Sequence, residues 1–151
     1  MAEKYVDIDT LKYLLYDIHN LEDLLVRDRF QDHDKESLDM FIDSVKEFAD
    51  RELFPYVKEM DENPAYHKDG KVFVHDQVKT MMYKGGEMGL ISAPFNYEDG
   101  GMQIPFLSHT AATYILDAAN NHLPGYAGLT QGAAELIIHF ANKELNQTYV
   151  P

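Results

Sequence analysis

Histidines and carboxylates are the residues of this sequence that could bind a metal ion. The chain has 7 His and 26 Asp or Glu. His19 with Glu22, and Glu135 with His139, are spaced three and four residues apart, so each pair would share one face of a helix and could form an ordinary side-chain contact. A metal site needs three or four converging ligands, and neither Glu-x-x-His nor His-Glu-x-x-His occurs. The sequence therefore predicts no metal site.

Three other kinds of site fail on spacing. Asp61, Asn63 and Ala65 would take the first ligand positions of a calcium loop, but Tyr66 stands where that loop needs glycine. Neither Gly-Gly pair belongs to a phosphate-binding loop, and no Gly-x-Ser-x-Gly nucleophile motif is present. Glu135 is the one carboxylate that burial on an apolar helix could perturb, and the alternative, which we favour, is a solvated position at the helix edge.

The segment of residues 124–151 combines glycines with a long apolar stretch and reads PGYAGLTQGAAELIIHFANKELNQTYVP. Because Gly125, Gly128 and Gly132 have no side chain, a ligand or another backbone could approach the start of a helix closely. Small residues are also common on buried helices that pack tightly. Both interpretations, a ligand groove and close helix packing, remain open, and we expect the rest of the chain to bury this segment.

Composition limits the classes of function that the chain can have. The 151 residues are 45% hydrophobic and suit one domain with its own core. A formal charge of −13, with no local cluster of Lys and Arg, disfavours nucleic acid as a partner. There is no cysteine, no secretory signal and no apolar run of membrane-spanning length. These features predict a soluble cytoplasmic protein without a membrane span.

Hydrophobic spacing predicts helices, which must position any site. We expect a first helix over residues 9–25, a second from residue 34 that kinks at Pro55 and continues through Met60, and later helices over residues 75–88, 106–120, 126–140 and 143–149. Pro105 suits the start of the helix over residues 106–120, whose predicted inward-facing residues are Leu107, Ala111, Tyr114, Ile115 and Ala118. Turn signals at Asp69-Gly70 indicate a loop with a tiny hairpin, and Gly89 suits a left-handed helix cap. The charged stretch of residues 27–36 is typical of a connector, so residues 1–30 could be an arm docked on the main bundle. The predicted fold class is all-α, a helical bundle with irregular loops.

The order of these motifs resembles the N-terminal helical domain of the flavin-dependent acyl-CoA dehydrogenases. The resemblance is carried by GEMGLISAPFNYEDGGMQIP, then a helix, then the segment of residues 124–151. Within the family, the chain is more narrowly similar to the subgroup with an N-terminal helical extension, which includes methylthiopropionyl-CoA dehydrogenases. Residues 1–30 would be that extension and residues 31–151 the domain itself. Glu98 and Asp99 interrupt the family's Tyr-Gly-Gly, and Gln103 stands where the family often has glycine, so the loop there departs from the family pattern.

The resemblance implies an enzyme of fatty acid metabolism that uses FAD, dehydrogenates an acyl-CoA thioester, forms homo-oligomers and passes electrons to an unidentified partner. The helix that begins near Gly128 lines the acyl chain in this family. The implied substrate-binding residues are Tyr126, Gly128, Leu129, Thr130 and Gly132. Packing remains the alternative role for the glycines.

The family continues beyond this domain into a β domain and a second helical bundle, which supply most flavin contacts and the catalytic glutamate. The sequence therefore predicts no catalytic residue within this chain, which we expect to be a domain fragment that is inactive alone. This hypothesis also predicts an exposed apolar surface. The alternative is a stand-alone helical interaction module that binds a protein partner without a cofactor.

Overall fold

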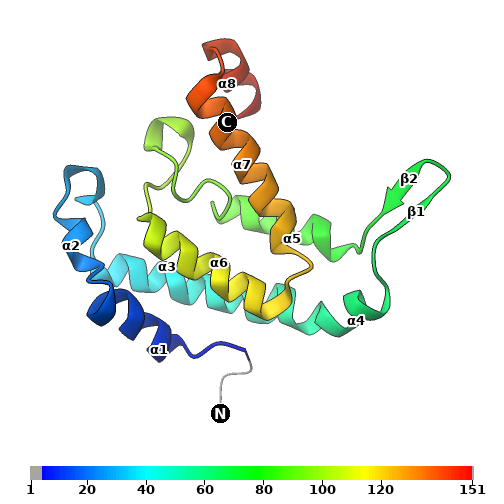
Figure 1. Cartoon of the computed structure of the whole chain (residues 1–151), viewed down its shortest axis with the longest axis horizontal. Coiled ribbons are helices and arrows are strands. Elements are labelled where there is room, and N and C mark those ends of the chain that lie inside the picture. The colour runs from blue at the N-terminus through cyan, green and yellow to red at the C-terminus, as the bar shows by residue number, and fades with distance from the viewer. Residues whose placement is uncertain (1–4, 151) are drawn as a thin grey trace.

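The computed structural model describes residues 5–150, and its helices confirm the predicted all-α class. In Figure 1, α3 and α4 follow the long axis of the molecule, α1 lies along one side, and α7 rises away from α6. Helix α6 packs against α3, and α7 packs against α5 and α6. The elements are α1 (Ile8–Tyr13), α2 (Glu22–Leu25), α3 (Lys35–Phe48), α4 (Val57–Glu62), β1 (Tyr66–Lys68), β2 (Lys71–Phe73), α5 (Gln77–Glu87), α6 (Phe106–Asn120), α7 (Pro124–Phe140) and α8 (Lys143–Tyr149).

The first predicted helix is broken in two, which corrects the expectation of one helix over residues 9–25. Asp7 caps α1 by accepting a hydrogen bond from the backbone N–H of Thr10 at 3.1 Å. The chain then widens into a π-helix over Leu14–Ile18 and turns at Asn20, whose φ of 49° is left-handed. Asparagine tolerates that conformation better than most residues. The break lets Leu21 enter the core, where it is fully buried.

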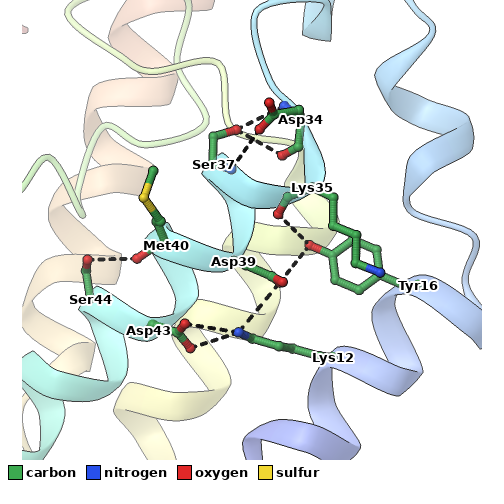
Figure 2. Close-up of polar contacts among 9 residues, drawn as sticks. All are labelled: Lys12, Tyr16, Asp34, Lys35, Ser37, Asp39, Met40, Asp43 and Ser44. Carbon is green, nitrogen blue, oxygen red and sulfur yellow. Dashed lines mark hydrogen bonds and ion pairs between the residues drawn. The ribbon is translucent and has the colours of Figure 1, made fainter.

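The segment before α3 is held along that helix by a series of polar contacts, part of which appears in Figure 2. Lys12 contacts Asp43 at 2.9 Å, and the hydroxyl of Tyr16 donates to Asp39 at 2.9 Å. Farther along, Tyr5 donates to Asp50 at 2.7 Å. Later residues of the segment thus meet earlier residues of α3, as expected for antiparallel elements.

Residues near the N-terminus also share the hydrophobic core of the bundle. Val6, Leu15 and Leu21 belong to the same buried cluster as residues of α3 and α6. The division into an extension over residues 1–30 and a domain over residues 31–151 stays a prediction. Within the described residues, the two parts are packed together.

The second predicted helix kinks at Pro55, as the sequence indicates. Asp34 and Ser37 form a reciprocal capping box at the start of α3. After α3 the chain passes through a π-helix over Ala49–Leu53 and a 3₁₀ turn over Phe54–Tyr56 before α4 begins. A proline in a helix removes one hydrogen bond and crowds the preceding turn. These changes in helical type carry the apolar face past Pro55, so that Met60 is still buried.

The predicted hairpin is present between α4 and α5. Strands β1 and β2 are antiparallel, with Tyr66 opposite Phe73 and Lys68 opposite Lys71. The turn residues Asp69 and Gly70 have φ values of 51° and 75°. Two successive left-handed residues are what a tight two-residue hairpin turn requires.

Two glycines shape the loop between α5 and α6. Gly100 follows a 3₁₀ turn over Tyr97–Asp99 and has a φ of 77°. A Cβ atom on Gly101 would overlap the backbone carbonyl of Phe95, so this position excludes every other residue without rearrangement of the loop. Gln103 also has a positive φ, of 51°. The loop therefore accommodates the two departures from the family pattern with a turn and a left-handed residue.

Helix α6 forms the centre of the bundle, although not through all the residues that the sequence predicts. Ala111 and Ile115 are buried as expected, but Tyr114 is 53% exposed. The buried face of α6 is rotated relative to the predicted one. The helix also buries these residues of the neighbouring face: Ser108, Ala112, Leu116, Ala119 and Asn120. Asn120 donates to the carbonyl of Leu53 at 3.0 Å and so joins α6 to the kink before α4.

Candidate functional site: the open face of helix α7

Helix α7 begins two residues earlier than the sequence predicts. Pro124 is its first residue and Gly125 lies in its first turn. Proline fits that position because its missing N–H would have no helical partner and its φ is already helical. The helix ends at Phe140, after which Asn142 caps α8 by accepting from the backbone N–H of Leu145 at 3.0 Å. A helix of 17 residues thus carries all five predicted site residues.

The predicted site residues are all exposed, and they lie on two faces of α7. Gly128, Leu129 and Gly132 share one face, where Leu129 is 80% exposed. Tyr126 and Thr130 lie on a neighbouring face, and the Thr130 hydroxyl donates to the carbonyl of Tyr126 at 2.9 Å. The structure thus brings three of the five together and leaves two beside them.

The first of these faces continues along the whole helix. It includes Gly125, which the sequence analysis also names, and two residues that sequence reasoning missed, Leu136 and Phe140, which are 61% and 83% exposed. Their spacing of three and four residues was the available signal, since it repeats one face of a helix. We call the set of Gly125, Gly128, Leu129, Gly132, Leu136 and Phe140 the open face of α7.

The three glycines of the open face do not serve helix packing within the described residues. At Gly125, Gly128 and Gly132, no atom of those residues would lie within 4 Å of an added Cβ, apart from the helix itself. The expectation that the rest of the chain buries this segment is therefore wrong for residues 5–150, because Pro124 is the one buried residue of α7. Helix α7 itself carries apolar residues on more than one side, and α5 and α6 pack against one of these sides.

The packed side of α7 is fixed to α6 by a polar contact. The imidazole of His109 bonds through Nε2 to the Gln131 side-chain oxygen at 3.1 Å, and Gln131 in turn donates to Glu135 at 3.4 Å. Burial lowers the pKa of His109 below its ordinary value, although the Gln131 contact opposes the shift. Glu135 is half-buried beside this contact, which agrees with the predicted position at the helix edge.

A polar cavity of about 310 Å³ lies between the far end of α7 and the loop before α6. Glu135, Ile138 and His139 line it from α7, and Arg29 lines it from the N-terminal segment. Arg29 donates to the side-chain oxygen of Asn96 and to the carbonyl of Pro94. The Arg29 guanidinium thus donates to neutral acceptors of the loop, and these hydrogen bonds hold the loop in place beside α7.

The open face consists of exposed apolar side chains and glycines, without a group for acid–base or nucleophilic chemistry. Its six residues carry no acid, base or nucleophile, and α7 has no Lys or Arg. An apolar strip with gaps at the glycines suits an apolar chain, because it offers contact area and excludes water. No group of three or more His, Asp or Glu within residues 5–150 is arranged to hold a metal ion, and no helix there is long and apolar enough to cross a membrane.

The chain matches the model of a known protein family. The family model described as the N-terminal domain of acyl-CoA dehydrogenase matches residues 35–151. The matched region begins at the first residue of α3 and includes the whole of α7. No curated protein matches the chain.

Proposed function

Because the chain belongs to the acyl-CoA dehydrogenase family through its N-terminal domain, we propose that the open face of α7 forms one wall of the acyl pocket in an FAD-dependent dehydrogenase of acyl-CoA thioesters. The family is one of oxidoreductases, which oxidise the bond between the α and β carbons of the acyl group. The observation that carries the proposal is an apolar helix face with three glycines and no covering residue among those described.

The physical role of this wall is to bind and orient the acyl chain. Leu129 and Phe140 are largely exposed, and covering such a side chain fully with apolar material contributes about 1.5–3 kcal/mol. Gly128 and Gly132 leave room for the chain beside the helix backbone. Removal of water from this strip also shields the thioester chemistry from solvent. Tyr126 and Thr130 then border the wall on one side.

FAD, as the hydride acceptor, belongs to the proposal, but the residues around α7 do not fit its diphosphate. Helix α7 has no cationic residue, and Arg29 beside it already bonds to loop carbonyl groups and shares its cavity with Asp99 and Glu135. A diphosphate prefers cations or free backbone N–H groups. We therefore assign the flavin site and the catalytic base to other parts of the enzyme and derive no chemical step from this domain.

The cellular setting follows from the same proposal. The enzyme would act in fatty acid metabolism, in the cytoplasm, as a homo-oligomer with a separate electron acceptor. A stand-alone interaction module without a cofactor is the alternative function. The family match over residues 35–151 does not favour it.

Filling the glycine gaps tests the proposed wall. In the dehydrogenase that contains this domain, we expect Gly128→Leu and Gly132→Leu to raise KM for long acyl-CoA by about tenfold and to leave short acyl-CoA nearly unchanged, because the added side chain occupies space that only a longer chain reaches. Steady-state kinetics over a series of acyl lengths measures this. Glycine has a helix propensity about 0.8–1 kcal/mol worse than that of alanine, and leucine is close to alanine, so the variants should fold.

Gly86→Leu is the matched control. Gly86 lies in α5 and, like the glycines of the open face, has no atom near an added Cβ. This variant should show wild-type kinetics with every substrate. If Gly128→Leu and Gly132→Leu lower activity equally for all acyl lengths, or have no effect, the open face is not an acyl wall.

A further inference from the structure

The hairpin of β1 and β2 extends beyond the helices at one end of the molecule (Figure 1). Every residue of both strands is exposed. A ribbon of two strands is marginally stable unless it packs against something else. The left-handed turn at Asp69 and Gly70 nevertheless favours this hairpin and its strand pairing. The sequence thus builds a projecting arm whose surfaces are left uncovered by the described residues.

One face of this arm combines aromatic rings with unpaired positive charge. Tyr66 and Phe73 stack with centroids 5.1 Å apart, and they are 57% and 42% exposed. Strand alternation places Lys68 and Lys71 on the same face, directly opposite each other. Like charges in that arrangement destabilise a sheet, and neither lysine has an ion-pair partner among residues 5–150. An acidic partner with an apolar centre would neutralise the two lysines and cover the two aromatic rings.

This chain carries such a surface at its opposite end. Val26 is 81% exposed at the end of α2, and Glu22, Asp23 and Asp28 around it are exposed and have no ion-pair partner within the described residues. Arg27 lies among them, and the group stays net acidic. We call these residues, Glu22, Asp23, Val26 and Asp28, the α2 surface. Figure 1 shows α2 and the hairpin at the two ends of the long axis.

We propose that the hairpin of one copy of this chain docks on the α2 surface of a second copy. Copies with a net charge of −13 repel each other in general, so a contact between them needs a local cationic site, which Lys68 and Lys71 supply. Because the two surfaces differ and lie at opposite ends, the contact is head-to-tail and adds further copies in a row. The contact area is small, so the association is weak and sensitive to salt.

Sedimentation velocity of the chain at increasing protein concentration, in low and in high salt, measures this association. We expect the weight-average sedimentation coefficient to rise with concentration without a plateau at the dimer, and to fall when salt is added. The variants Lys68→Glu/Lys71→Glu and Glu22→Lys/Asp23→Lys should each weaken association by about tenfold or more. The control Lys79→Glu/Lys143→Glu makes the same change in charge as the hairpin variant, at two exposed lysines elsewhere, and should associate about as strongly as the wild type.

A mixture of the two variants separates this proposal from other modes of association. Each variant keeps one intact surface, and the two altered surfaces are again opposite in charge, so an equimolar mixture should associate through both pairs, although neither variant associates alone. Circular dichroism verifies that each variant is folded. A wild-type chain that stays monomeric, or a mixture that does, overturns the proposal. If Lys68→Glu/Lys71→Glu associates as strongly as the wild type, the proposal is also wrong, and self-association belongs to another surface, such as the open face of α7.

Discussion

His109 connects the two helices whose relative position defines the open face. It reaches from α6 to Gln131 on α7, and its ring lies 5.9 Å from that of Phe106. A neutral imidazole can donate to the amide oxygen without a buried charge, whereas a protonated ring would bring a charge into a place that is poorly solvated. Together with the packing against α5, this contact holds α7 in the rotation that turns its glycines outward.

The lowered pKa of His109 predicts a pH dependence of folding. The unfolded chain takes up this proton near pH 6.5 while the folded chain does not, so the free energy of unfolding should fall as the pH drops below about 6.5. His109→Gln should cost about 1 kcal/mol at neutral pH through the lost hydrogen bond, and its deficit relative to wild type should shrink in acid. Urea unfolding at several pH values measures both quantities.

His19→Gln is the control, because His19 is an exposed histidine and so reports the general effect of removing one such residue. A deficit of His109→Gln that grows as the pH falls would contradict the assigned role of burial.

Residue patterns predicted the glycines of the site but not what surrounds them. Gly128 and Gly132 were identified by their place in the motif, whereas the empty space beside them depends on how α5 and α6 cover the helix. The contact between His109 and Gln131 was missed, because residues 22 positions apart on different helices meet only after the helices pack. Gly101 likewise looked like part of a motif, and only the fold shows its contact with Phe95.

At the scale of elements, the N-terminal segment stabilises α3 and thereby the bundle on which α7 stands. Tyr16 is buried against α3, donates to Asp39 and has the Lys35 ammonium 4.4 Å from its ring centre. Burial, together with the Asp39 contact, raises the pKa of the Tyr16 phenol. The hydroxyl therefore stays protonated and keeps donating at any ordinary pH.

Removal of that hydroxyl should weaken the attachment. Tyr16→Phe should lower the free energy of unfolding by about 1 kcal/mol, because Asp39 loses a partly buried hydrogen-bond donor. The matched control is Tyr13→Phe, since Tyr13 is 54% exposed and has no hydrogen bond from its hydroxyl among the described residues. Urea unfolding of both variants gives the comparison. Equal effects of the two substitutions would show that the Tyr16 contact contributes nothing measurable.

Hydrophobic spacing predicted most elements because amphipathic helices and their caps are local features. Asp34, Pro105 and Gly89 mark helix ends in the structure as they do in the sequence. The π-helical turns over Leu14–Ile18 and Ala49–Leu53 could not be predicted in this way. Each widens a helix so that the following residues reach the core, and that need arises from packing between distant elements.

At the scale of the whole molecule, apolar surface remains uncovered on the open face of α7 and on the hairpin. Large exposed apolar patches commonly mark places of interaction. The sequence predicted that such a surface exists, although it placed α7 itself in the core. Periodicity reports that a helix is apolar but not which partner covers it. We assign the acyl chain to the open face of α7 and a second copy of the chain to the hairpin.

The contact between an acyl chain and α7 can be measured directly with an acyl-CoA that carries a photoreactive diazirine near the end of its chain. After irradiation of the intact dehydrogenase and digestion, mass spectrometry identifies the labelled peptide. We expect labelling within residues 124–140, on Leu129, Leu136 or Phe140, and its loss when an excess of unlabelled acyl-CoA is present. Specific labelling confined to other helices, with none on α7, would contradict the assignment of the open face as the acyl wall.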